Sequence, residues 1–135
     1  MRISVLTVTI ALVSTTALAT EAPNLPKSAK KLSGAEIEVL YKDASLSGSN
    51  FEGKSLLSFK VKTNTAKMSI VGNWSTADGA SGQVDLTYRI RGDQWCYKPT
   101  SKNAKETCVA VYSDGSDIYE VKKGSHVSSK NAVSY

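Results

Sequence analysis

Histidine and cysteine are scarce in this chain, which has one histidine and two cysteines among 135 residues. A structural zinc site takes four nitrogen, sulfur or oxygen ligands, which these residues cannot easily supply. His126 is also the only imidazole available for acid–base catalysis, and its neighbours Ser125, Ser128 and Ser129 lie in a tail-like segment rather than a triad. We therefore expect no catalytic residues, no metal site, no bound cofactor and no enzymatic activity.

Long hydrophobic runs are also missing, except at the amino terminus. Arg2 is followed by the mainly apolar stretch 3–13 and by small residues that end in Ala17-Leu18-Ala19. This order is typical of a signal peptide with an A-x-A cleavage site, because a membrane-spanning helix needs about 20 predominantly apolar residues. We expect cleavage after Ala19, export to the periplasm or secretion, and no transmembrane segment in the mature chain.

Clusters of positive charge are missing although the chain is basic. It has 17 lysines and arginines against 12 acidic residues, which gives a formal net charge of +5. Basic residues are adjacent only at 30–31 and 122–123, whereas nucleic-acid-binding proteins usually concentrate them in a stripe. The charge therefore indicates solubility, with weak affinity for anionic envelope surfaces, and we expect no nucleic-acid partner.

The two cysteines, Cys96 and Cys108, are twelve positions apart. In an exported chain, oxidising conditions favour a disulfide between them over the alternative of a metal site. The bond would join two neighbouring strands across the loop between them, and Trp95 and Tyr97 would lie on the face opposite the cystine. We predict that this disulfide stabilises the small domain.

The segment after the predicted cleavage site, residues 20–31, contains two prolines and little apolar content. We expect it to be an extended lead-in without a packed partner of its own. The predicted organisation is thus a signal peptide (1–19), this lead-in, and a single β-rich domain (32–135).

A short helix is predicted at the start of that domain. Ser33 and Glu36 have the spacing of a capping box, in which the two side chains satisfy exposed backbone donors. An apolar stripe with helical spacing follows, formed by Ile37, Leu40 and Tyr41. We expect the helix to end in the segment 44–48.

From residue 57 the spacing of apolar residues changes to two, which is typical of half-buried strands. Strands are predicted at 57–62, 67–70, 83–91, 95–98, 107–112 and 118–121, with a short one around Val127. Turns are predicted at Gly72-Asn73, Gly92-Asp93 and Asp114-Gly115. The regular spacing predicts a mainly β fold, a curled antiparallel meander or small barrel of about seven or eight strands.

Three short motifs have functional counterparts elsewhere but simpler interpretations here. Arg91-Gly92-Asp93 is a tripeptide recognised by some adhesion receptors, yet a two-residue hairpin turn also requires glycine and aspartate. Asn73-Trp74-Ser75 fits a glycosylation acceptor, and we interpret Asn73 as a turn residue. The acids Asp114, Asp117 and Glu120 lack EF-hand spacing, so we interpret them as turn and solvent-face residues.

Aromatic residues are the best candidates for a binding site. In a small curled sheet they either fill the interior or line the mouth of a pocket. The set consists of Trp74, Tyr88, Trp95, Tyr97, Tyr112 and Tyr119. We expect them mainly in the core, with pocket lining as the alternative.

Three motifs occur in an order that resembles a known family. They are Leu32-Ser33-Gly34-Ala35-Glu36-Ile37, Gly92-Asp93-Gln94-Trp95-Cys96-Tyr97, and the stretch from Cys108 through Tyr112-Ser113-Asp114-Gly115. In these features the chain resembles the small exported bacterial proteins of the domain of unknown function 995. The resemblance implies a calycin-like small β-barrel and assigns no catalytic residue.

The sequence leaves three hypotheses for function. We expect a monomeric, non-enzymatic binding or interaction module of the bacterial envelope, whose partner is a small apolar ligand or an envelope or host protein. The second hypothesis is an inhibitor or interaction factor that uses residues 20–31 as a segment ordering on binding. The third is a hydrolase that uses acidic residues which the sequence does not single out.

Overall fold

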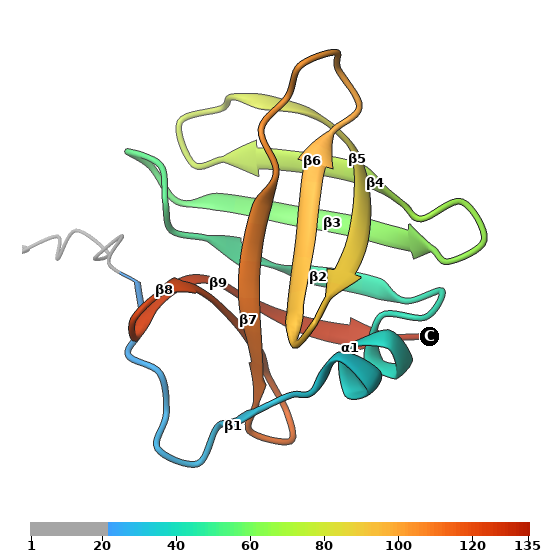
Figure 1. The fold of residues 1–135 in the computed structure, drawn as a ribbon. Helices are drawn as coiled ribbons and strands as arrows, with labels where there is room; N and C mark the ends of the chain where they lie inside the picture. The colour runs from blue at the N-terminus through green and yellow to red at the C-terminus, as the bar shows by residue number, and fades with distance from the viewer. Residues whose placement is uncertain (1–21) are drawn as a thin grey trace, which may run out of the picture.

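The computed structural model of the protein describes residues 22–135 (Figure 1), and the predicted signal peptide, residues 1–19, lies outside the described residues. No helix in the described part is long and apolar enough to cross a bilayer. The elements are β1 (Lys30–Lys31), α1 (Gly34–Leu40), β2 (Ser45–Asn50), β3 (Leu57–Asn64), β4 (Ser69–Thr76), β5 (Ser81–Arg91), β6 (Gln94–Pro99), β7 (Thr107–Ser113), β8 (Ile118–Lys123) and β9 (His126–Ser134).

Eight antiparallel strands form a closed barrel. Each strand from β2 to β8 pairs with the next strand along the chain, and β9 pairs with β2 to complete the ring. The ninth strand, β1, lies outside the ring on β7. The prediction of a mainly β fold is confirmed, but the helix is not the first element, because β1 precedes it.

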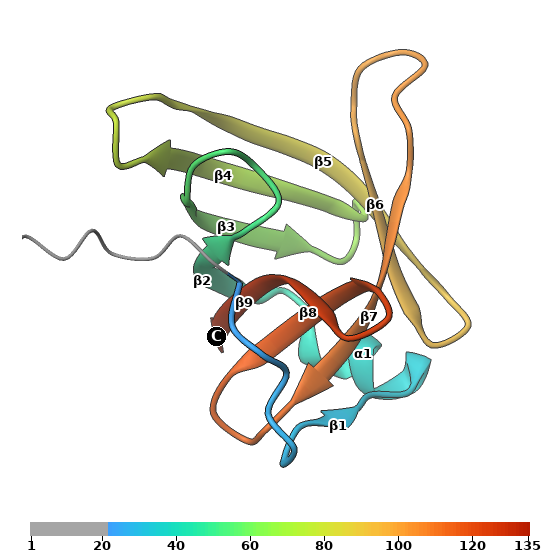
Figure 2. The same cartoon turned by 90° about the vertical axis from the view of Figure 1, so that its left-hand side faces the viewer.

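The long strand β5 gives the barrel its two layers. Residues 81–87 pair with β4, whereas residues 86–91 pair with β6, so β5 belongs to both layers. Figures 1 and 2 show β6 and β7 running across β2, β3 and β4 at a steep angle. The space between these layers is the interior of the barrel.

Two glycines lie inside strands at points where the sequence predicts other structures. Gly48 lies within β2 and Gly72 within β4. The predictions that the helix ends in the segment 44–48 and that Gly72-Asn73 forms a turn are therefore wrong, and Asn73 is a strand residue. A Cβ atom at Gly48 would overlap the backbone of Lys130, and one at Gly72 would overlap that of Lys60. Glycine occurs at both positions because the adjacent strand approaches too closely for a side chain.

Helix α1 begins as its sequence predicts. The backbone N–H of Glu36 donates to Ser33 Oγ (3.3 Å), and the backbone N–H of Ser33 donates to Glu36 Oε2 (2.7 Å), which confirms the capping box. Ile37 and the C-cap residue Tyr41 are buried in the main core. These two side chains fix the helix across one end of the barrel, beside the β5–β6 turn (Figure 1).

The Arg91-Gly92-Asp93 tripeptide has a structural role. Gly92 and Asp93 form the predicted two-residue turn between β5 and β6, and Gly92 has a φ of 59°. Asp93 Oδ1 accepts a hydrogen bond of 2.8 Å from the backbone N–H of Gly34 at the start of α1. The turn thus holds the amino-terminal end of the helix against the barrel.

The lead-in packs against the barrel over its described part, residues 22–31. Leu25 and Ala29 contact a second cluster of buried residues on β8 and β9, and Asn24 forms a β-bridge with His126. The prediction that the lead-in lacks a packed partner is wrong here, because it covers apolar side chains that β8 and β9 leave outside the barrel. The tail-like interpretation of the segment around His126 is also wrong, since β9 runs through it.

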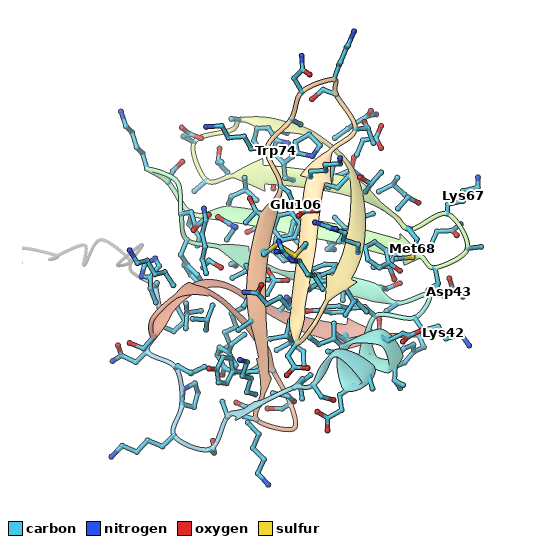
Figure 3. The ribbon with its side chains drawn as sticks, in the orientation of Figure 1. Lys42, Asp43, Lys67, Met68, Trp74 and Glu106 are labelled. Carbon is cyan, nitrogen blue, oxygen red and sulfur yellow. A yellow bond between two sulfur atoms is a disulfide. The ribbon has the colours of Figure 1, made fainter. Side chains whose placement is uncertain are left out.

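Thr63 joins the end of the helix to the barrel. Its Oγ1 accepts a hydrogen bond from the backbone N–H of Ala44 (2.8 Å) and donates one to the carbonyl oxygen of Tyr41 (2.6 Å). Nearby, the backbone N–H groups of Asp43 and Thr65 donate to each other's side chains. Figure 3 shows Asp43 beside the β3–β4 turn. The link from α1 to β2 is therefore fixed by hydrogen bonds to β3 and this turn.

Replacing Thr63 by valine should destabilise the protein by about 1–3 kcal/mol, because a buried N–H group and a buried carbonyl group lose their partner. Urea unfolding monitored by tryptophan fluorescence measures the change. Thr63→Ser keeps the hydroxyl group and should retain most of the stability. Equal stability of the valine and serine variants would contradict the assigned role.

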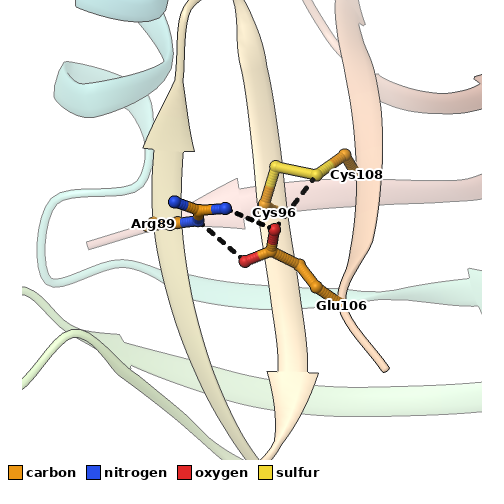
Figure 4. The surroundings of a disulfide bond; sticks show 4 residues. All are labelled: Arg89, Cys96, Glu106 and Cys108. Carbon is orange, nitrogen blue, oxygen red and sulfur yellow. Dashed lines mark hydrogen bonds and ion pairs between the residues drawn. A yellow bond between two sulfur atoms is a disulfide. The ribbon is translucent and has the colours of Figure 1, made fainter. Parts of the chain in front are cut away.

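The predicted disulfide joins Cys96 and Cys108, which are direct cross-strand partners on β6 and β7. Arg89 of β5 is the partner of Cys96 on its other side. Its guanidinium forms two hydrogen bonds with the Glu106 carboxylate, at 2.8 and 2.7 Å (Figure 4). The ion pair lowers the pKa of Glu106 below its ordinary value. The disulfide and the ion pair together connect three adjacent strands on one face of the sheet.

Removing the disulfide in a Cys96→Ala, Cys108→Ala double variant should lower the free energy of unfolding by about 3 kcal/mol. The bond restricts the conformations of the unfolded chain, and a loop of this length contributes about that much. Thermal and urea unfolding of the oxidised protein and the double variant measure the loss. Adding a reductant should destabilise the wild type and leave the double variant unchanged. An unchanged wild type would show that the bond contributes nothing to stability.

Candidate functional site

A pocket of about 450 Å³ lies inside the barrel. Its walls come from the strands β2 to β6 and from β8 and β9. Most of the wall is apolar, and the main aliphatic and phenylalanine contributors are Leu46, Leu57, Phe59, Val61, Ile70 and Leu86. Inward-facing side chains of a barrel of this size either fill it completely or leave room for one small ligand, and this barrel leaves room.

The two ends of the pocket differ. At one end, α1 covers the barrel with Ile37 and Tyr41, which are buried in the main core. The other end is lined by the exposed residues Gln83, Asp85 and Pro99, together with half-buried Trp74. Trp74 lies far from Asp43 and the helix end of the barrel in Figure 3. The pocket is therefore closed at the helix and open between the start of β5 and the end of β6.

Three polar side chains line the buried part of the pocket. Glu120 of β8 is 5% exposed, and Ser129 and Asn131 of β9 are 1% and 3% exposed. Ser129 is the cross-strand partner of Glu120, and a bulge in β8 follows directly after Glu120. The pairing of β8 with β9 thus places a carboxyl, a hydroxyl and an amide group together on the pocket wall.

Several of these polar atoms have no hydrogen-bond partner among the described residues. They are Ser129 Oγ and both polar atoms of the Asn131 amide, and the buried atoms Tyr41 Oη and Trp95 Nε1 also lack partners in this part of the chain. An unpaired buried polar atom costs about 1–3 kcal/mol, so proteins rarely keep a group of them without a use. The cluster therefore has hydrogen-bonding capacity that a bound molecule could use.

The carboxyl group of Glu120 has an unusual acidity. Burial disfavours its charged form and raises its pKa to about 7, with a smaller contribution from the negative charge of Glu52. The neighbouring hydroxyl groups of Ser129 and Tyr41 act in the opposite direction. Burial raises the pKa of Tyr41 and of Tyr97, and the negative charge of Glu120 adds to both shifts. Glu120 can therefore gain or lose a proton near neutral pH.

Sequence analysis missed this cluster. It interpreted Glu120 as a turn or solvent-face residue, which is wrong, because the lead-in and the barrel bury both faces of β8. One signal was available, since Glu120 is two residues from Ile118 and so shares a face with a core residue. Ser129 and Asn131 carried a similar signal, because they share a face of β9 with the partly buried Val133.

The six aromatic candidates fall into three groups. Trp74, Trp95 and Tyr97 line the pocket, whereas Tyr88 is buried in the core beside Trp95. Tyr112 and Tyr119 belong to the cluster under the lead-in, and the hydroxyl group of Tyr119 donates to Asp114 Oδ2.

Other candidate residues form no site of their own in residues 22–135. Cys96, Cys108 and Glu106 are close enough together to hold a metal ion, but the two sulfur atoms are joined in the disulfide. The Asp114 carboxylate accepts hydrogen bonds from its own turn, where the backbone N–H groups of Ser116 and Asp117 donate to it. His126 is exposed and lies outside the pocket.

The stability of the protein should fall as pH rises from about 5 to 8. The folded state holds a proton on Glu120 up to a pKa of about 7, whereas the unfolded chain releases it near the ordinary value of 4.5. The unfolded state then binds fewer protons over this interval, and the loss attributable to Glu120 is about 3 kcal/mol. Urea unfolding at a series of pH values measures it.

Glu120→Gln should remove this part of the pH dependence and make the protein more stable than the wild type at about pH 8. Glu38→Gln, an exposed change on α1, is the matched control and should keep the wild-type profile. Parallel profiles for the wild type and Glu120→Gln would contradict the perturbed acidity.

Comparison with protein-family models, curated proteins and solved structures finds no match to this chain. The resemblance to the domain of unknown function 995 therefore stays a prediction from its three motifs. The functional interpretation of the pocket depends on its own geometry and chemistry.

Proposed function

We propose that this protein is an exported, non-enzymatic binding module that holds a small, largely apolar molecule inside a calycin-like barrel. One observation supports this more than any other: the barrel contains a pocket of about 450 Å³ with mainly apolar walls. Pockets that bury small organic ligands commonly have volumes of about 300–1,000 Å³ and combine apolar walls with a few placed polar groups.

The pocket differs from a packing defect in two respects. The first is its volume of about 450 Å³, because protein interiors are close-packed and voids larger than a water molecule are few. A defect would also be lined by apolar groups alone, whereas this pocket has Glu120, Ser129 and Asn131 on its buried wall. The combination is typical of a site that recognises a polar group on an otherwise apolar molecule.

The pocket supports binding better than the two alternative functions. The described part of the lead-in already packs against Tyr119, Val121 and Val127, so it is less suited to ordering on a partner. A hydrolase would need a second acid–base group or a nucleophile with an activating base beside Glu120. The groups around Glu120 are hydroxyl, amide and phenol groups, which are suited to holding a ligand.

Filling the pocket should abolish binding without unfolding the protein. Leu86 lines the pocket on β5, and Leu86→Trp would place an indole in the space for the ligand. Val71 on β4 is exposed beside it, and Val71→Trp is the matched control that adds the same side chain outside the barrel. We expect an apolar fluorescent probe to bind the wild type and Val71→Trp, with at least about tenfold weaker binding to Leu86→Trp.

Circular dichroism of all three proteins verifies the fold, and native mass spectrometry counts the bound probe molecules. Equal binding to the two tryptophan variants would place the probe on the surface and overturn the proposed function. Binding lost only in Leu86→Trp would support it.

A further inference from the structure

We propose that the ligand is an amphipathic primary amine, with its ammonium group against Glu120, Ser129 and Asn131 and its apolar part directed toward the open end. This inference rests on the proposed function and specifies the chemical class of the ligand. Four features of the pocket support it.

The first feature is the sign of the charges in the pocket. One buried carboxyl group, that of Glu120, lines it, and the exposed residue Asp85 lies at the open end. No lysine, arginine or histidine is among the described residues that line it, although the whole chain has more basic than acidic residues. A ligand with a carboxylate or phosphate group would meet no positive charge there, whereas an ammonium group would be attracted to the ionised Glu120 at the end of its path.

The second feature is the match between donors and acceptors. A primary ammonium group has three N–H donors. Acceptors available to it are the Glu120 carboxylate, Ser129 Oγ and Asn131 Oδ1, and the last two lack partners among the described residues. A charge-assisted hydrogen bond to a buried carboxylate is stronger than one between neutral groups. An ammonium ion would thus satisfy these three acceptors and also stabilise the ionised form of Glu120.

The third feature is the aromatic surface beside this cluster. The ring centroid of Trp95 is 4.2 Å from that of Tyr41 and 5.5 Å from that of Tyr97. Trp95 and Tyr97 line the same pocket as Glu120. Aromatic faces attract cations through their quadrupoles, and the attraction increases where water is excluded.

The fourth feature is the apolar surface between the polar cluster and the open end. Leu57, Phe59 and Leu86 line the pocket there and are only partly buried by the protein. Burying an alkyl chain against them contributes about 0.8 kcal/mol per methylene group. The amine would therefore be held by its charge at one end and by apolar contacts along its length.

Three ligands with the same ten-carbon chain separate these contributions: decylamine, decanol and decanoate. Isothermal titration calorimetry at about pH 8, below the concentration at which the ligands form micelles, measures their affinities for the full protein. We expect decylamine to bind about tenfold or more tightly than decanol, and decanoate to bind most weakly.

Glu120→Gln tests the assigned contact. The variant should lose the preference for decylamine over decanol, because a neutral amide does not attract the ammonium charge. Glu38→Gln removes an equal charge from the surface and should retain the preference. Quenching of the Trp74 and Trp95 fluorescence on titration would place the ligand in the pocket.

The outcomes distinguish the two proposals. Decanol or decanoate binding as tightly as decylamine overturns the amine assignment and leaves the proposed function standing. A preference for decylamine that survives in Glu120→Gln also overturns the assignment. If none of the three ligands binds, the proposed function itself fails.

Discussion

The pairing of β9 with β2 is the interaction on which the rest of the structure depends. It joins Ser45–Asn50 to residues 129–134 at the far end of the chain and converts a meander of hairpins into a closed ring. Closure removes two exposed sheet edges and encloses an interior. Because the two strands are distant in sequence, folding must close a long loop before their contacts stabilise it.

The same closure produces the polar wall of the pocket. β9 is held between β2 and β8, so its side chains Ser129 and Asn131 must face an interior that Glu120 of β8 also faces. Burying a carboxyl group beside unpaired polar atoms destabilises the fold, and natural sequences tend to break packing rules in this way at functional sites. The contacts that complete the barrel therefore also create the feature that suits it to recognising a polar group.

Local physical chemistry explains which elements could be predicted. The capping box at Ser33, the alternation along β5 and the Gly92-Asp93 turn each depend on residues that are neighbours in sequence. The errors occurred where distant segments meet. The sequence predicts that Gly48 and Gly72 interrupt regular structure, yet both lie inside strands, because adjacent strands approach closely there. The contacts of the lead-in could not be predicted either, because the apolar surface beneath it comes from the other end of the chain.

The sequence by itself determined the strand-rich fold, the helix start, the turn between β5 and β6, and the pairing of the only two cysteines. Each of these follows from periodicity, capping, turn chemistry or composition. Only the tertiary structure decided that the interior retains a pocket and that Glu120 faces it. Strand alternation specifies that two faces exist, but it does not specify which face is enclosed. That depends on the register and closure of the barrel, which arise from backbone pairing between segments far apart in the chain.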